Sequence, residues 1–545
     1  MANKGQGLFI CHSSFVIRHL DWIVRLTTLL FAAALAYEPL YHLFRGSLAF
    51  SVFPQDDFYY YYLTAKNIAL HGFSSFDGIV PTNGYHPLWL WVLSAVSFVV
   101  RSNDRSFFIA LEGIQIISAM VSAELLMRLL SRLFTPSSWL YVVSLGAAVL
   151  ETVLIFTGME TVLAIPLLLL FAWMVMNAME QMDRRSLLLA GFIGSLLVLA
   201  RLDTVIAVGL ALVLLFQSRV LPRYLAWFVF GLVPVVLYLL SDFVFYGDLI
   251  PVSAQVKQLP GGFRFSFRAI EAIGTPRGSL YFLTTIIGFV LALWAWKKPN
   301  ARSGVRLLLV AFPILFTLLL ALRVTWSSYL WYFYPFPIST AVALLLLREQ
   351  WTKWTRWTEW SGIAALGLII IFSALFLVRD IPMMTTNFRL PPQHPYLHAL
   401  GIQPFTESHP GRYAMGDRAG ITAFMTHQPM LQLEGLAADE AMVDSIRGRA
   451  DLLSVLRRYG VQYYIVSYPL REFHESAMLW DLVEPHEQQI QPYVPRMRGR
   501  FYAPDVFRYP GYPAPAEAST SDSAVWITRI LDISHAIEYT PMEGK

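Results

Sequence analysis

The chain has 545 residues, of which 56% are hydrophobic and 14% are charged, whereas soluble globular proteins carry roughly 25% charged residues. Because the apolar residues come in blocks about 20 residues long, this composition excludes a soluble enzyme and indicates an integral membrane protein. The net charge of +4 does not indicate a nucleic-acid partner, since the basic residues cluster between the hydrophobic blocks. The single cysteine, Cys11, excludes an intramolecular disulfide and an all-cysteine metal site.

The hydrophobic blocks predict about eleven transmembrane helices, because each span needs about 17–25 apolar residues. The predicted spans are Trp22–Phe44, Phe107–Leu130, Leu140–Phe156, Thr161–Met179, Ser186–Ala200, Thr204–Phe216, Tyr224–Phe245, Ser279–Trp296, Val305–Leu322, Tyr329–Leu347 and Gly362–Val378. The block Leu88–Val100 is interpreted as an interfacial helix. Counting it as a span would place Arg128 and Arg132 outside, against the positive-inside rule.

With that assignment the loops rich in lysine and arginine all lie on one side, which predicts a multi-pass protein of the inner (plasma) membrane. The amino terminus is then inside, and the first long loop and the carboxyl end are outside, in the periplasm or at the cell exterior. The predicted domains are a cytoplasmic segment 1–21, a membrane domain 22–379 that includes the outer loop 45–106, a linker 380–395, and a soluble α/β domain 396–545.

The soluble domain is predicted from a change in sequence pattern after Arg379, where apolar runs alternate with amphipathic stretches. Arg412–Ala414 and Gln462–Val466 read as strands, and Asp439–Arg458 reads as a helix. The segment GDRAG at Gly416–Gly420 lacks the lysine and the spacing of a phosphate-binding loop, so it is interpreted as a strand-to-helix turn.

Two adjacent carboxylates, Asp56 and Asp57, follow the first span in the loop FPQDDFYYYYLTAKNIALHG. An acidic pair beside a bilayer is costly, so it predicts a functional site, although a solvated loop at a helix end is the simpler alternative. An aspartate of ordinary pKa, about 3.9, is ionised at neutral pH and can accept a hydroxyl proton. We therefore predict that this pair is catalytic.

Other polar and aromatic residues gather on the same predicted face. Each of the charges alone reads as an ordinary helix-end residue, and the aromatic residues alone read as an interfacial belt. Together, basic groups can hold a phosphate and aromatic rings can receive an isoprenoid tail and a sugar face. The predicted donor-binding residues are Arg201, Lys257, Arg323, Tyr329, Tyr332 and His86, and a divalent cation, if one is present, has Asp57 and Glu160 as candidate ligands.

The motifs DDFYYYYLTAKNIALHGFSSFDG, PTNGYHPLW, TGMET, ARLDT, GDLIPVSAQVK, WYFYP and GDRAGITAF resemble the membrane-embedded glycosyltransferases of the GT-C fold. Relatives in that fold include protein mannosyltransferases, the aminoarabinose transferase of lipid A, arabinofuranosyltransferases and oligosaccharyltransferase catalytic subunits. The resemblance implies an acidic motif in the first outer loop and an outer tail domain. It also implies an inverting transfer from a polyprenyl-phosphate-linked sugar to a glycan, lipid or protein acceptor. Several relatives carry Asp-Glu where this chain has Asp56-Asp57, which implies that Asp56 is the base.

Two other functions are compatible with a polytopic chain. A transporter or flippase of a lipid-linked glycan also places charges between helices, but it favours paired repeats and charges at the midplane, neither of which the sequence shows. A non-catalytic scaffold that displays the terminal domain leaves the acidic, aromatic loop unexplained.

Overall fold

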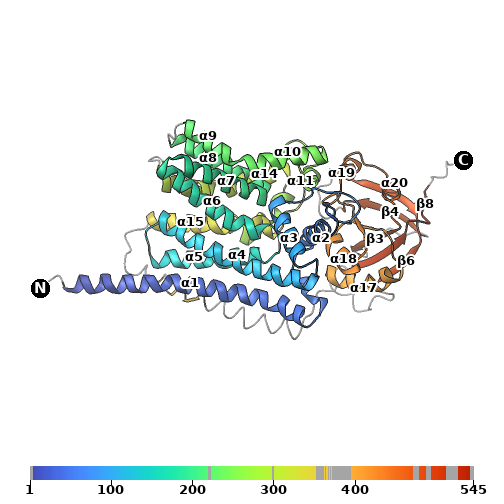
Figure 1. The fold of residues 1–545 in the computed structure, drawn as a ribbon, viewed down its shortest axis with the longest axis horizontal. Coiled ribbons are helices and arrows are strands. Elements are labelled where there is room, and N and C mark those ends of the chain that lie inside the picture. The colour runs from blue at the N-terminus through green and yellow to red at the C-terminus, as the bar shows by residue number, and fades with distance from the viewer. Residues whose placement is uncertain are drawn as a thin grey trace.

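The computed structural model describes residues 4–218, 222–296, 300–350, 394–469, 478–486, 493–510 and 526–539, with single residues between 361 and 370. A bundle of long helices that run alongside one another carries an α/β domain on one end (Figure 1). We call this the near end of the bundle. The amino terminus extends from the opposite, far end.

The bundle contains long apolar helices that run between the two ends. Within the described residues, seven helices are long and apolar enough to cross a membrane, and the pair α9 and α10, bent by 44°, makes an eighth when counted as one span. The bundle helices are α1 (Lys4–Phe44), α4 (Asp104–Leu133), α5 (Ser138–Ile155), α6 (Thr161–Gln181), α7 (Arg184–Ala200), α8 (Val205–Gln217), α9 (Pro222–Gly231), α10 (Val233–Tyr246), α13 (Pro276–Trp296), α14 (Ala301–Arg323) and α15 (Phe336–Gln350).

Each of the first ten predicted spans corresponds to helical structure, α9 and α10 together forming the span predicted at Tyr224–Phe245. Two of these helices, α7 and α8, are shorter than the seven that are long enough to cross a membrane. The last predicted span, Gly362–Val378, lies outside the described residues apart from single positions. The predicted interfacial helix is α3 (Pro87–Val99), which at about 1.5 Å per residue is too short for a hydrocarbon core about 30 Å thick. It packs at the near end against α2 (Asp56–His71) and α7.

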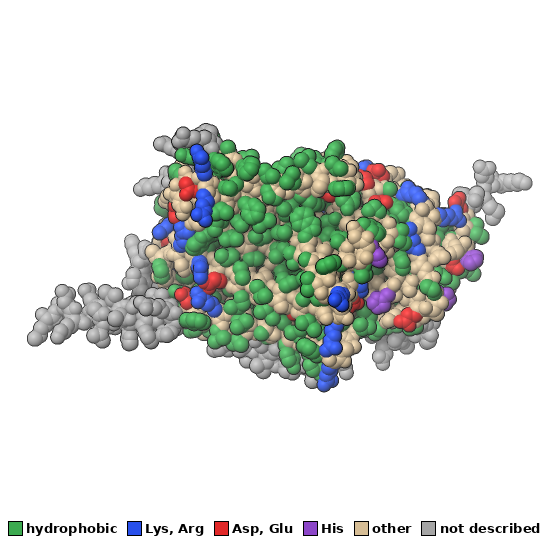
Figure 2. All heavy atoms as spheres, viewed as in Figure 1, with side chains coloured by type: hydrophobic (Ala, Val, Ile, Leu, Met, Phe, Trp, Pro, Cys, Tyr) green, Lys and Arg blue, Asp and Glu red, His purple; other side chains and the backbone are tan. Residues whose placement is uncertain are grey.

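The surface of the bundle has the pattern that a bilayer requires. Figure 2 shows a continuous hydrophobic surface over the bundle, bordered at the far end by lysine and arginine side chains. The bundle helices expose large apolar residues, among them Phe216, Val244 and Leu280. Soluble proteins rarely expose an apolar surface of this extent to water. The predicted fold class, a polytopic α-helical membrane protein with a C-terminal α/β domain, is confirmed.

Short elements fill the near end between the bundle and the α/β domain, and most of the predicted site residues lie within or directly beside them. They are η1 (Leu48–Val52), α2, α3, η2 (Leu202–Thr204), α11 (Val252–Lys257), η3 (Arg268–Ile270), α12 (Glu271–Gly274) and η4 (Leu330–Phe333).

The α/β domain is built on a five-stranded sheet of order β2-β1-β3-β7-β6, in which β1 is parallel to β2 and β3, and β7 is antiparallel to β3 and β6. A three-stranded antiparallel sheet, β4-β5-β8, adjoins it. The strands are β1 (Tyr413–Met415), β2 (Met430–Gln432), β3 (Tyr463–Pro469), β4 (Leu479–Glu484), β5 (Met497–Tyr502), β6 (Asp505–Tyr509), β7 (Trp526–Asp532) and β8 (Ile537–Glu538).

The domain's helices are α17 (Pro395–Ser408), α18 (Ala419–Thr426), α19 (Glu440–Arg447) and α20 (Leu452–Arg458). The two predicted strands are present as β1 and β3. The stretch Asp439–Arg458, predicted to be helical, contains two helices, α19 and α20, with a break between them. The second helix has its own N-cap, with the Asp451 side chain accepting from the Ser454 amide at 2.7 Å.

The α/β domain packs directly on the first loop of the bundle. Its helix α18 contacts α2, and Arg412 forms an ion pair with Asp77 at 2.7 Å. Gly84 of the first loop lies so close to the domain that an added Cβ would stand 1.9 Å from the Leu436 carbonyl oxygen. The first loop and the α/β domain, which are far apart in the sequence, therefore pack together at the near end of the bundle.

Candidate functional site

Asp56 and Asp57 form the first turn of α2, at the near end of the bundle. Carboxylates are favoured at this position because the helix dipole is positive at its amino end. The helix is fixed by its tyrosines: the Tyr59 hydroxyl donates to the Ser51 carbonyl at 2.6 Å, and the Tyr62 hydroxyl donates to Asp104 at 2.6 Å. The acidic pair is thus held on a rigid element and not on a free loop.

Both carboxyls of the pair lie in surroundings that disfavour their charge. The pKa of Asp56 is raised to about 7, mainly by burial. The Ile421 hydrogen bond lowers it, and the neighbouring Asp57 and Asp417 charges contribute to raising it. Burial also raises the pKa of Asp57 to about 6, partly offset by Lys257. Carboxyls with pKa values near neutrality are well matched to proton transfer at physiological pH.

The α/β domain completes the surroundings of Asp56. The Ile421 amide, in the first turn of α18, donates to Asp56 Oδ1 at 2.8 Å. Gly420 permits this approach, since a Cβ there would lie 2.4 Å from the Asp56 carbonyl oxygen and 3.2 Å from both carboxylate oxygens. The GDRAG segment is the predicted strand-to-helix turn between β1 and α18, but it also belongs to the site, which the sequence interpretation missed.

Two cavities share Asp57 as a lining residue. The first, of about 60 Å³, lies toward the membrane domain and is lined by Asp57, His86, Glu160, Lys257 and Tyr332 among others. The second, of about 100 Å³, lies toward the α/β domain and is lined by both aspartates, Lys257, Asp417 and Glu434 together with aromatic rings. Asp57 and Lys257 thus line both cavities, whereas Asp56 lines only the second of the two.

Lys257, at the end of α11, is the basic residue that lines both cavities. Its Nζ lies 3.4 Å from the Tyr332 hydroxyl, and it forms no ion pair within 4.0 Å with any described carboxylate. Burial lowers the pKa of Lys257, but the Tyr332 and Asp57 groups outweigh it, so the ammonium is charged. This group is available to an anionic ligand.

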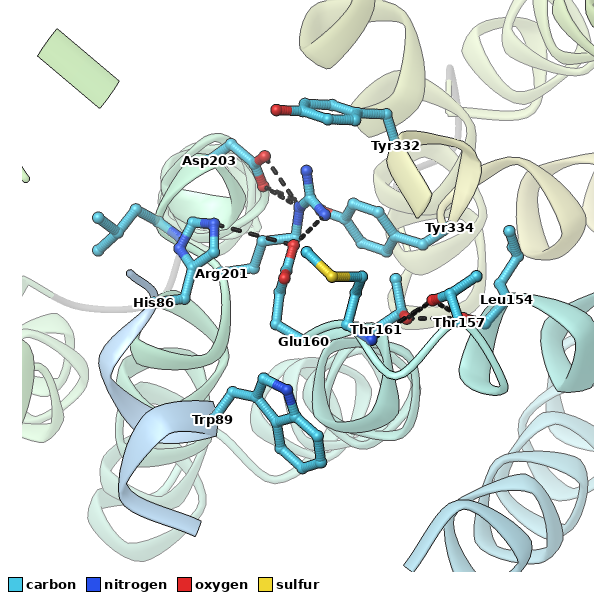
Figure 3. Close-up of polar contacts among 12 residues, drawn as sticks. His86, Trp89, Leu154, Thr157, Glu160, Thr161, Arg201, Asp203, Tyr332 and Tyr334 are labelled. Carbon is cyan, nitrogen blue, oxygen red and sulfur yellow. Dashed lines mark hydrogen bonds and ion pairs between the residues drawn. The ribbon is translucent and has the colours of Figure 1, made fainter. Parts of the chain in front are cut away.

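Arg201 is held differently from Lys257, although both were predicted to bind the donor. Figure 3 shows its guanidinium between Glu160 and Asp203, with the rings of Tyr332 and Tyr334 beside it. The ion pairs measure 2.5 Å to Glu160 and 3.0 Å to Asp203, and Arg201 is 1% exposed. A guanidinium that two carboxylates already neutralise is a scaffold for the site more than a phosphate ligand.

His86 and Arg323 lie at the edges of the site. His86 lines the first cavity, its Nδ1 accepts from the Leu202 amide at 3.2 Å, and burial and Arg201 lower its pKa to about 3, so it is neutral. Arg323 donates to Gln258 at 2.6 Å and lies over the Phe263 ring, and it lines neither cavity.

The two predicted tyrosines lie on different cavities. Tyr329 borders the second cavity and stacks on Trp331, with ring centroids 4.9 Å apart and planes inclined by 10°. Tyr332 borders the first cavity beside Lys257. Both cavities are thus bordered by an aromatic ring from the segment around η4.

The predicted ligands for a divalent cation do not fit a metal centre. Glu160 is occupied by Arg201 through Oε1, and its Oε2 accepts from the Tyr61 hydroxyl at 3.3 Å. In the part of the chain that the structure describes, no three His, Cys, Asp or Glu side chains are grouped to hold a metal ion.

No protein-family model matches the chain, and no curated protein matches it. Among solved structures, it is similar to the oligosaccharyltransferase AglB from Archaeoglobus fulgidus in complex with an inhibitory peptide and a dolichol-phosphate. That match has a TM-score of 0.46 and 13% identity, and covers 82% of this chain and 69% of that chain. It is also similar to ArnT from Cupriavidus metallidurans bound to undecaprenyl phosphate, with a TM-score of 0.44, 14% identity, and coverage of 88% and 97%. At these identities and scores the similarity concerns the course of the chain, and function rests on its own side chains.

Proposed function

We propose that this protein is a membrane glycosyltransferase that moves a sugar from a polyprenyl-phosphate-linked donor to a hydroxyl acceptor, with Asp56 as the general base. The observation that carries the proposal is a pair of carboxyls with raised pKa values, of which Asp57 lines both cavities and Asp56 lines the second, beside the ammonium of Lys257, which forms no ion pair with a described carboxylate. A base for an alcohol and a cation for a phosphate, placed together at a membrane surface, suit this reaction.

The reaction is a single displacement at the anomeric carbon. The acceptor oxygen forms the new bond to that carbon, the bond to the phosphate oxygen breaks, and Asp56 takes the acceptor's proton. The phosphate is already a good leaving group, so no covalent sugar–enzyme intermediate is needed. The displacement inverts the configuration of the anomeric carbon.

Lys257 acts on the donor side of this reaction. Its ammonium would neutralise the charge that grows on the leaving phosphate, a type of interaction that is stronger in the transition state than in the bound donor. Arg201 would act through Glu160 and Tyr332, which border the first cavity, by fixing their positions.

The experiment uses the full-length protein in lipid vesicles with a panel of labelled polyprenyl-phosphate sugars. We expect release of polyprenyl phosphate from at least one donor, and its loss in Asp56→Asn. A protein that moves the intact lipid-linked glycan across the vesicle membrane without breaking the glycosidic bond is a flippase, and that result would refute the proposal.

The proposed orientation places the cavities and the α/β domain on the outer face. It rests on the basic residues at the far end of the bundle, among them Arg128, Arg132 and Arg306. A reporter fused near Gly411 should be active outside, and a reporter fused between Lys297 and Arg306 should be active inside. A cytoplasmic signal at Gly411 would reverse the proposed orientation.

A further inference from the structure

Two residues that line the second cavity each carry a buried polar atom with no hydrogen-bond partner among the described residues. The two atoms are Oε1 of Glu434, from the α/β domain, and Nε1 of Trp326, which follows α14. Each residue is 2% exposed. Burying a polar group without a hydrogen-bond partner is costly, so two such groups beside one cavity point to a ligand that pairs with both.

The hydrogen-bonding capacity of these two atoms is fixed by their surroundings. Gln432 donates to Glu434 Oε2 at 2.9 Å, which leaves Oε1 as the oxygen without a partner. Burial, followed by the nearby Asp417 and Glu484 charges, raises the pKa of Glu434 well above its usual range, which favours the protonated form of this carboxyl. Its proton then belongs on Oε1, and Trp326 Nε1 is always a donor.

We infer that the second cavity is the acceptor subsite, in which Glu434 and Trp326 donate hydrogen bonds to hydroxyl oxygens of an uncharged sugar unit. The inference rests on the proposed function and extends it to the acceptor's chemical class. The carboxyl groups around the cavity disfavour an anionic acceptor, and a neutral Glu434 gives no charge of its own to attract an amine.

The shape and lining of the cavity agree with a sugar ring. The cavity has a volume of about 100 Å³, well above the roughly 10–15 Å³ that a single water needs, so it can admit part of a sugar ring. The rings of Tyr329 and Trp331, stacked at 4.9 Å, border it and can cover the apolar face of a sugar. Asp56 borders the same cavity, where it can reach the reacting hydroxyl.

The test measures initial rates of transfer to methyl glycosides, used as neutral probe acceptors, from whichever donor the panel above identifies. We expect Trp326→Phe and Glu434→Ala each to raise the KM for the glycoside by about 3- to 10-fold, the effect of losing one neutral hydrogen bond. The KM for the donor should change by less than about twofold. Glu434→Gln, whose amide can still donate into the cavity, should restore the glycoside KM.

Glu407→Gln is the matched control, because it removes a carboxylate from the exposed face of α17 in the same domain, and it should leave both constants unchanged. Equal rises in donor and glycoside KM, or no rise in either variant, would overturn the assignment and leave a cavity that holds only water. The two failures are distinguishable. Absence of any donor cleavage by the wild type refutes the proposed function, whereas cleavage with unaltered glycoside KM in the variants refutes only the subsite.

Discussion

The sharpest prediction concerns the pH dependence of transfer and its control by the acidic pair. Asp56 must be ionised to take a proton, and its pKa is raised to about 7. The rate should therefore fall as the pH drops through about 7, losing close to tenfold per pH unit below that value. An aspartate in water, with a pKa of about 3.9, would keep the rate flat down to about pH 5.

Asp56→Asn keeps the side-chain volume but removes the base. Positioned general-base catalysis is worth about 10²–10⁴ in rate, or about 2.7–5.4 kcal/mol at 1.36 kcal/mol per tenfold. We expect a loss of that size, and the remaining rate should no longer fall between pH 8 and pH 6. Asp57→Asn should be milder, and because Asp57 raises the pKa of Asp56 by charge repulsion, its acid limb should move to lower pH.

The assay is the initial rate of polyprenyl phosphate release between pH 5 and pH 9, at subsaturating donor, in vesicles. Asp248→Asn is the matched control, since it removes a carboxylate of the same end of the bundle that lines neither cavity. A near-normal rate in Asp56→Asn, with the acid limb still near pH 7, would refute Asp56 as the base. If Asp57→Asn alone abolished the limb, the base would be Asp57.

Three further variants test the geometry of the site. Lys257→Ala should lower kcat/KM for the donor by roughly 10- to 100-fold, mainly through kcat, because a hydrogen bond to a charged group contributes about 1.5–3 kcal/mol and this one is strongest in the transition state. Arg323 lines neither cavity, so Arg323→Ala should change kcat/KM only slightly. Arg201→Ala should lower the thermal unfolding midpoint, since breaking a buried ion pair costs about 3–5 kcal/mol, and a selective change in donor KM without destabilisation would contradict this. Gly420→Ala should reduce turnover by up to about 100-fold by displacing α18 from Asp56, while Gly209→Ala, where a Cβ meets nothing within 4 Å, should remain active.

The sequence by itself determined the membrane domain and the place of the acidic pair. In a bilayer, the backbone N–H and C=O groups of a hydrophobic block of span length find hydrogen-bond partners within the block only if it forms a helix. The positions of α4, α6 and α14 therefore follow from local composition. The distribution of basic residues over the loops, and not the length of its hydrophobic block, separated α3 from the spans. Asp56 and Asp57 could be singled out because charge is rare beside apolar segments, a signal that lies within a few residues of sequence.

Only the tertiary structure decided which polar groups face the cavities and which hold the scaffold together. Arg201 and Lys257 are both basic residues in the sequence, but Arg201 is neutralised by Glu160 and Asp203, whereas Lys257 lines two cavities and forms no ion pair with a described carboxylate. Glu434 lines the same cavity as Asp56 only because the α/β domain packs on the first loop. Such contacts join residues more than 300 positions apart, and no local pattern encodes them, because they depend on how two separately folded parts fit together.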